Sequence, residues 1–165
     1  MTTLHLSRPV ACVVGQAPQY LDRFFAEHAK GDAAVLALRA PFVIPGLPEM
    51  TLTRDSVVRI ARANHRGEMI ARYDVSWQPS GGGPFPSFTG SLSIPNAEDY
   101  ENCFLQLDGS YEPPLGKLGA AFDAVVGHAV AESTGRDLLE RIGTYLEQSC
   151  RATEAAKANR RARAT

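Results

Sequence analysis

The feature that most constrains this chain is a change of hydrophobic period near residue 113. Apolar side chains recur at every second position before that point and at helical spacing after it. Alternation is typical of a strand with one buried face, and the wider spacing is typical of a helix. We therefore expect a strand to enter a long C-terminal helix through Pro113-Pro114-Leu115-Gly116. The alternating residues are Leu105, Leu107, Gly109 and Tyr111, and the helical ones are Leu118, Phe122, Val125, Val126, Ala129 and Val130.

Composition predicts one soluble domain. The chain has 165 residues, of which 44% are hydrophobic and 21% are charged, which is ordinary for a globular domain with a substantial core. Its 17 Lys and Arg nearly balance 18 Asp and Glu, so no global field favours nucleic acid or an anionic membrane. No run approaches the roughly 18 to 20 apolar residues that an integral membrane helix needs.

The cysteines and histidines are too scattered to predict a metal site or a disulfide framework. Cys12, Cys103 and Cys150 are odd in number and far apart, so we expect reduced thiols. The run Val10 to Val14 is too short for a secretory segment, and we expect a cytoplasmic protein, as a monomer or homodimer. No motif for a cofactor or for covalent catalysis occurs, and the four histidines lack metal-ligand spacing.

Local patterns predict the elements before the C-terminal helix. A short strand is expected over 10–14 and a helix over 18–29, where Tyr20, Leu21, Phe24 and Phe25 form one apolar face. A second short helix is expected from Asp32 through Val35, Leu36 and Leu38, ending at Pro41. An apolar loop over 41–48 follows, then strands over 50–63 and 68–77 joined by a turn at 64–67, a loop over 78–86, and a strand over 88–94.

The C-terminal helix is expected over 116–150, with a bend. Leu138, Leu139, Ile142 and Leu146 lie about half a turn away from the stripe that begins at Leu118. We therefore expect a kink near Ser133 to Gly135, or burial on different sides at the two ends. The basic, alanine-rich segment 150–165 is expected to be a frayed or disordered tail, which is either solvated or in contact with an acidic partner.

This order of elements, together with two local stretches, resembles the START-related (SRPBCC) superfamily, which includes polyketide cyclase-like proteins. The stretches are Phe85 to Leu92 and Leu107 to Gly119, the second containing the Pro-Pro-Leu-Gly turn. The resemblance implies an α+β helix-grip fold, in which a curved antiparallel sheet wraps around a long C-terminal helix. It also implies two short helices after the first strand, a single domain over 1–149, and a cavity for hydrophobic ligands without a shared catalytic motif.

Inward-facing residues of the predicted strands and helix would line such a cavity. They are Phe42, Tyr73, Val75, Trp77, Phe88, Leu92, Leu105, Leu107, Tyr111, Phe122, Val125 and His128.

Three polar residues are candidates for chemistry. His128 lies in a helical row with Ala124, Ala131 and Gly135, where it either faces the cavity as an acid or base or pairs at the surface with Glu132. Tyr73, like Tyr111, offers either a phenol handle in an apolar wall or simple core packing with one hydrogen bond. Arg54 either points inward toward an anion or is turned outward by twist or a bulge.

These observations favour a binding protein for a hydrophobic small molecule, of lipid, aromatic or polyketide-like character. The alternating strand faces and the small residues of the helix leave volume between them. A cyclase- or dehydratase-type enzyme, resembling polyketide cyclases and aromatases, is the first alternative, and it requires two polar groups to converge on one point. A structural or interaction protein with a filled core is the second.

Overall fold

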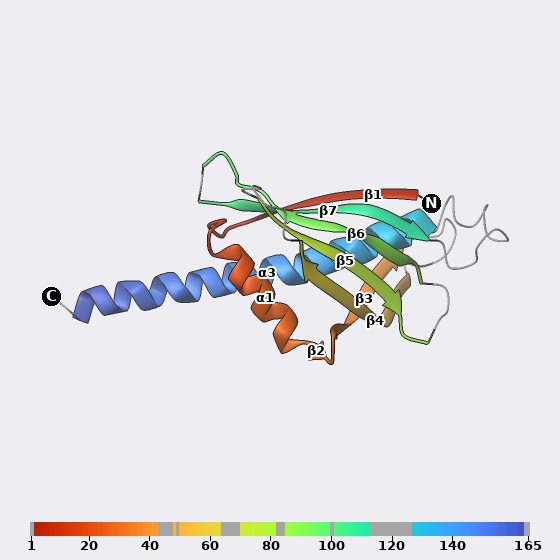
Figure 1. The fold of residues 1–165 in the computed structure, drawn as a ribbon, viewed down its shortest axis with the longest axis horizontal. Coiled ribbons are helices and arrows are strands. Elements are labelled where there is room, and N and C mark those ends of the chain that lie inside the picture. The colour runs from red at the N-terminus through yellow and green to blue at the C-terminus, as the bar shows by residue number, and fades with distance from the viewer. Residues whose placement is uncertain are drawn as a thin grey trace.

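In a computed structural model, the described part of the chain forms one antiparallel sheet and the helices α1 and α3 (Figure 1). The structure describes residues 2–42, 48, 50–63, 70–81, 85–99, 101–112 and 127–163, without the side chains at 41, 42, 50 and 52. The fold class is α+β, as predicted. The elements are β1 (Thr2–Val10), α1 (Ala17–Glu27), β2 (Ala29–Lys30), β3 (Ala33–Phe42), β4 (Met50–Arg62), β5 (Ala71–Pro79), β6 (Ser87–Ile94), β7 (Cys103–Glu112) and α3 (His128–Arg163).

The sheet has seven strands in the order β1-β7-β6-β5-β4-β3-β2. From β2 to β7 each strand pairs with the next one in sequence, so most of the sheet is a meander. The first strand is the exception, because β1 crosses to the far edge and pairs with β7 from Thr2 opposite Tyr111 to Val10 opposite Cys103. This pairing brings the beginning of the chain to the last strand before α3.

α3 lies across one face of the sheet and packs mainly on β3 and β1. Its buried positions follow one stripe from Ala131 to Cys150, and the helix continues without interruption through the predicted bend at Ser133 to Gly135. Gly135 allows α3 to lie close to β1, because a Cβ at this position would lie 2.5 Å from Leu6 Cδ1. The first part of the predicted helix, residues 116–126, lies outside the described residues.

Two sequence predictions near the N-terminus are wrong. The predicted second helix is strand β3, in which Ala34, Leu36 and Leu38 alternate toward the core and are at most 4% exposed. Of the two expected short helices, the described residues therefore contain only α1, which matches the prediction over 18–29. The first strand runs over Thr2–Val10 rather than 10–14, with Leu4 and Leu6 buried.

The four later strands agree with the prediction to within about three residues. β4, β5, β6 and β7 all fall on the alternating stretches that indicated them. The turn at 64–67 lies outside the described residues, as does most of the loop over 41–48 and part of that over 78–86. β1, β2 and β3 complete the sheet of seven strands.

The expectation of reduced thiols is wrong for two of the three cysteines. Cys12, just after β1, forms a disulfide with Cys150 of α3, across a sequence separation of 138 residues. Sequence spacing could not indicate this pair, because the crossing of β1 to β7 is what brings Cys12 to α3. Cys103 remains a free thiol, and burial raises its pKa to about 11.

Beyond Cys150 the helix leaves the body of the molecule. Figure 1 shows the C-terminal part of α3 continuing past α1 with no strand beside it. Residues 151–163, the predicted tail, continue the same helix. No described helix is both long and apolar enough to cross a membrane.

Candidate functional site

The register places three aromatic residues side by side on the face that α3 covers. Trp77 of β5 is paired with Phe88 of β6, and Phe88 is paired with Tyr111 of β7. Cross-strand partners project to the same face of a sheet, and this face is the one that Leu107 shares with Gly135 of α3. We call these three residues the aromatic row. Each of them is at most 2% exposed.

A pair of glycines lies next to the aromatic row. Gly90 and Gly109 are cross-strand partners on β6 and β7, one inward position further along each strand. A Cβ at either position would lie within 2.7 Å of Phe88 Cζ, so the Phe88 ring rests over the bare backbone. Trp77 stacks on Phe88 with ring centroids 4.1 Å apart and planes 12° apart. The glycine pair therefore lets the Phe88 ring lie against the sheet, and Trp77 stacks on that ring.

The indole of Trp77 has a polar group for which the described part of the chain supplies no partner. Its Nε1–H is buried, and no described residue accepts a hydrogen bond from it. A buried donor without an acceptor costs about 1 to 3 kcal/mol in desolvation. Buried indole N–H groups usually find a partner. Trp77 thus presents one donor inside an otherwise aromatic and aliphatic surface.

Tyr73, a predicted candidate, uses its hydroxyl within the fold. It donates to the carbonyl oxygen of Pro18, at the start of α1, over 3.4 Å. Burial, and secondarily the charge of Asp22, raise its pKa to about 12, so the phenol is neutral at physiological pH. Tyr73 is four residues from Trp77 along β5, about 13 Å in a strand. Its hydroxyl ties the sheet to α1.

The other two candidates do not meet Tyr73. His128 begins α3 and is exposed, with its ring centroid 6.0 Å from that of Tyr111. Its expected surface partner, Glu132, instead accepts a hydrogen bond from Arg136 over 2.6 Å. Arg54 lies on β4 opposite Leu38 and is partly buried. Tyr73 therefore lies apart, at the α1 end of the sheet, whereas His128 lies near Tyr111 and Arg54 lies opposite the buried Leu38.

Most residues predicted to line a cavity lie on the α3-facing side of the sheet. This group is at most 2% exposed and comprises Tyr73, Val75, Trp77, Phe88, Leu92, Leu105, Leu107 and Tyr111. Phe122, Val125 and the side chain of Phe42 lie outside the described residues. Along Ala131 to Cys150, the sheet-facing residues of α3 are part of the hydrophobic core. The small residues of α3, which suggested open volume, accommodate leucines of β1 and β7 at Gly135.

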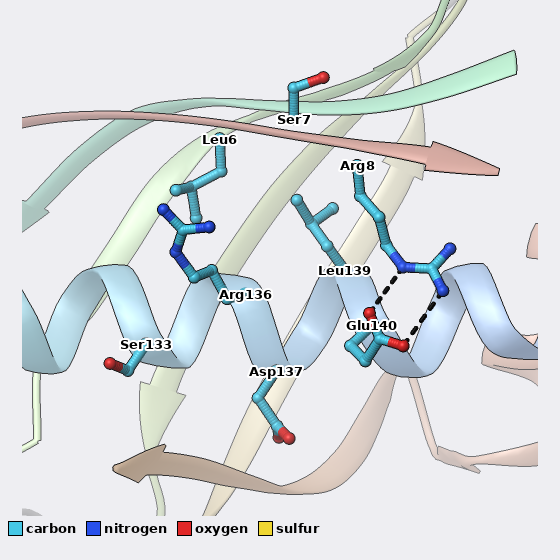
Figure 2. A pocket seen from close by; sticks show the side chains of 8 residues that line it. All are labelled: Leu6, Ser7, Arg8, Ser133, Arg136, Asp137, Leu139 and Glu140. Carbon is cyan, nitrogen blue, oxygen red and sulfur yellow. Dashed lines mark hydrogen bonds and ion pairs between the residues drawn. The ribbon is translucent and has the colours of Figure 1, made fainter. Parts of the chain in front are cut away.

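A groove lies between β1 and α3, and sequence reasoning missed it. Its volume is about 390 Å³, and Figure 2 shows its walls. Arg8 closes one end by donating from Nε and Nη2 to the two carboxylate oxygens of Glu140, at 2.7 and 3.1 Å, and from Nη1 to Glu147 at 3.2 Å. We call the contact of β1 with α3 the seam. The groove is lined by Leu6, Ser7, Arg8, Ser133, Arg136, Asp137, Leu139 and Glu140.

The charges of the seam are satisfied by one another. The hydrogen bond to Glu140 is the main reason that the pKa of Arg8 is raised, and the same bond lowers the pKa of Glu140. Gly143 makes room for this arrangement, since a Cβ there would lie 2.0 Å from Arg8 Nη1. Asp137 is engaged by Arg141 at 2.9 Å and by the backbone N–H of Arg39 at 3.0 Å. The seam thus holds structural ion pairs rather than groups available for catalysis.

Sequence reasoning found the members of the aromatic row but not their arrangement. The row depends on the register of β5, β6 and β7, which no single strand reveals. One feature of the sequence could have indicated the row. Gly90 and Gly109 occupy inward positions in alternating strands, where a glycine often marks close approach of another group to the backbone. Within the described ranges, no group of three or more His, Cys, Asp or Glu side chains could hold a metal ion.

Comparison with known proteins does not identify a family for this chain. No family model and no curated protein matches the chain. Among solved structures, the protein TTHA0849 from Thermus thermophilus is 14% identical with a TM-score of 0.43, over 86% of this chain and 97% of that one. A protein from Nitrosospira multiformis is 16% identical with a TM-score of 0.34, over 82% and 96% of the two chains. Likenesses of this extent carry no information about function.

Proposed function

We propose that the protein binds an apolar small molecule that carries a hydrogen-bond acceptor, and that the ligand lies against the aromatic row. The observation that supports this most is the buried Nε1–H of Trp77, for which no described residue supplies an acceptor. A carbonyl or ether oxygen on an aromatic or aliphatic skeleton would recover the cost of burying that donor. The stacked faces of Trp77 and Phe88 suit a planar ring.

The same proposal places the chain in the START-related superfamily with a helix-grip fold. In its support, the seven-stranded sheet and the long helix across one face match the expected architecture. The proposed ligand position covers a smaller part of the space between helix and sheet than the sequence suggested. The sheet-facing residues of α3 from Ala131 to Cys150 belong to the hydrophobic core, and the buried donor of Trp77 favours the aromatic row, toward the start of α3, as the proposed site.

Catalysis is the weaker alternative. A cyclase or dehydratase needs polar groups that converge within hydrogen-bond reach of a substrate. The hydroxyl of Tyr73 is engaged by Pro18, and His128 is exposed beyond Tyr111. The predicted cytoplasmic location is not part of this proposal, because a bonded Cys12–Cys150 pair is typical of oxidising compartments.

Trp77 also makes the proposal testable, because it is the single tryptophan of the chain. N-phenyl-1-naphthylamine, a neutral apolar probe, accepts excitation energy from indole when the two are close. Titration of the folded protein should quench Trp77 emission and raise probe emission together. A folded protein that neither binds the probe nor carries an apolar molecule in native mass spectrometry would support the filled-core alternative instead.

A matched pair of competitors tests the hydrogen bond. Fluorene and 9-fluorenone share one planar skeleton, and only fluorenone has a carbonyl oxygen. We expect fluorenone to displace the probe at roughly tenfold lower concentration, as one hydrogen bond to a buried donor allows. Trp77→Phe should remove this preference, whereas Tyr73→Phe should retain it. Equal displacement by both competitors from the unaltered protein would refute the role of Trp77.

A further inference from the structure

The C-terminal part of α3 is a helix without tertiary cover. Residues 151–163, which we call the basic arm, are exposed except for partial burial at Thr153 and Lys157. The arm has 13 residues and is therefore about 20 Å long. Figure 1 shows it extending beyond every strand and past α1. Because packing of a buried stripe does not hold this segment, both its helical structure and its role require a separate explanation.

Several features of the basic arm favour a helical structure in water. It continues an existing helix, so it avoids the unfavourable nucleation step that isolated helices must make. Alanine, the best helix former, occupies positions 152, 155, 156, 158 and 162. Its root is fixed to the body by the Cys12–Cys150 disulfide and by the hydrogen bond between Tyr20 Oη and Thr153 Oγ1 at 2.6 Å. The arm therefore points in a defined direction from the body.

Charge is divided between the arm and the body. The arm contains five basic residues and one acidic residue, a net charge of +4, while the rest of the chain has 12 basic and 17 acidic residues, a net charge of −5. The nearly neutral total, which predicted no attraction to anionic surfaces, conceals this division. Screening in physiological salt reduces electrostatic interactions over about 8 Å. An arm of about 20 Å thus holds the acidic body beyond the range of repulsion from whatever its tip touches.

The positive charge of the arm is concentrated at its tip. Lys157 is paired with Glu154 over 2.7 Å, which neutralises the middle. Arg160, Arg161 and Arg163 follow within the last turn. Contact along the length of a nucleic acid groove would use cations spread along the helix, and stacking on bases would use aromatic side chains, of which the arm has none. A cluster at the tip suits a flat surface approached end-on.

We infer that the basic arm docks the protein end-on to an anionic phospholipid surface. The contact is electrostatic, because the arm carries no large apolar side chain that could insert into the acyl region. Each basic residue near an anionic leaflet contributes a similar increment of binding. The docking does not depend on the proposed small-molecule site, which lies toward the opposite end of α3, near His128.

The test is co-sedimentation of the full chain with vesicles. Phosphatidylcholine vesicles that contain phosphatidylglycerol should bind the protein, and pure phosphatidylcholine vesicles should not. The variant Arg160→Gln/Arg161→Gln/Arg163→Gln should bind the anionic vesicles roughly a hundredfold more weakly. Gln keeps helix propensity, so circular dichroism should show an unchanged helix content. Displacement of the naphthylamine probe by fluorenone should be unaffected, which separates this test from that of the small-molecule site.

A charge-matched control isolates the position of the cations. Arg23→Gln/Arg59→Gln/Arg62→Gln removes the same number of exposed positive charges from the body. We expect it to bind anionic vesicles within about threefold of the unaltered chain, since those residues lie on α1 and β4 rather than on the arm. An equal loss in both variants would overturn the inference, as would no binding to anionic vesicles. Tighter binding to duplex RNA than to the anionic vesicles at equal salt would overturn it in favour of a nucleic acid.

Discussion

The seam and the aromatic row both depend on glycines, but they differ in how their polar groups are satisfied. At the seam, Gly143 makes room for Arg8, whose guanidinium donates to Glu140 and Glu147. At the aromatic row, Gly90 and Gly109 make room for a ring, and the neighbouring indole N–H has no described acceptor. At the seam, the fold itself supplies the hydrogen-bond partners of Arg8, so we interpret this region as structural. Where no described residue supplies an acceptor, as at Trp77, a ligand that supplied one would gain binding free energy.

The largest expected effect tests the glycines of the aromatic row. In Gly90→Ala the new Cβ would lie 2.1 Å from the backbone oxygen of Asp108, so the strands themselves must separate. We expect the free energy of unfolding in urea to fall by about 4 kcal/mol.

Gly143→Ala provides the contrasting variant at the seam. The three atoms nearest its Cβ would all belong to the Arg8 guanidinium, the far end of a long side chain, and alanine is the better helix former by about 1 kcal/mol. Its unfolding free energy should change by less than about 1 kcal/mol. Similar losses in the two variants would contradict the distinction between a backbone obstacle and a side-chain obstacle.

The disulfide beside the seam should have the next largest effect. In Cys12→Ser/Cys150→Ser the unfolded chain is no longer closed into a loop, so we expect a loss of about 3 kcal/mol in unfolding free energy. Thiol titration of the unaltered, denatured chain should find one reactive group, Cys103. Three titratable thiols in a protein purified under oxidising conditions would exclude the disulfide.

Trp77→Phe should lower the free energy of unfolding much less than the burial of Trp77 suggests. The smaller ring loses packing, but the variant also removes a buried donor that has no described partner. We expect a net loss of about 1 kcal/mol, against about 3 to 5 for removal of a large aromatic side chain from a core. Thermal unfolding of the ligand-free protein would measure it. A loss of the full core magnitude would show that the aromatic row is as well satisfied as the seam.

The smallest effect concerns pH at the seam. Arg8 holds the pKa of Glu140 below its ordinary value of 4.5, so the ionised carboxylate stabilises the fold above that value, and this contribution is lost as the pH falls through the folded-state pKa. Glu140 is 66% exposed, which limits the contribution to about 0.5 kcal/mol. Glu140→Gln should therefore be slightly less stable than the unaltered chain at neutral pH. The difference should vanish in acid, and a difference that persists there would refute this account.

Sequence patterns predicted elements whose signal is local. The alternation of Tyr73, Val75 and Trp77 located β5, and the apolar face containing Phe24 located α1. β3 was misassigned because its Ala and Leu residues have high helix propensity, and pairing with β4 overrode that preference. Within the candidate site, the identities of the aromatic residues were predicted, but their adjacency and the unpaired N–H depend on register and packing.

The position of β1 has a consequence for synthesis of the chain. β2 to β7 pair with sequence neighbours, so this part of the sheet can assemble as it leaves the ribosome. β1 pairs only with β7 among the described strands, so it must wait until Cys103–Glu112 has been made. During that interval the apolar side chains of β1 and the open edge of β7 are both exposed to other molecules. Closure of the sheet by its first strand is therefore expected to be a late step in folding and the one most vulnerable to aggregation.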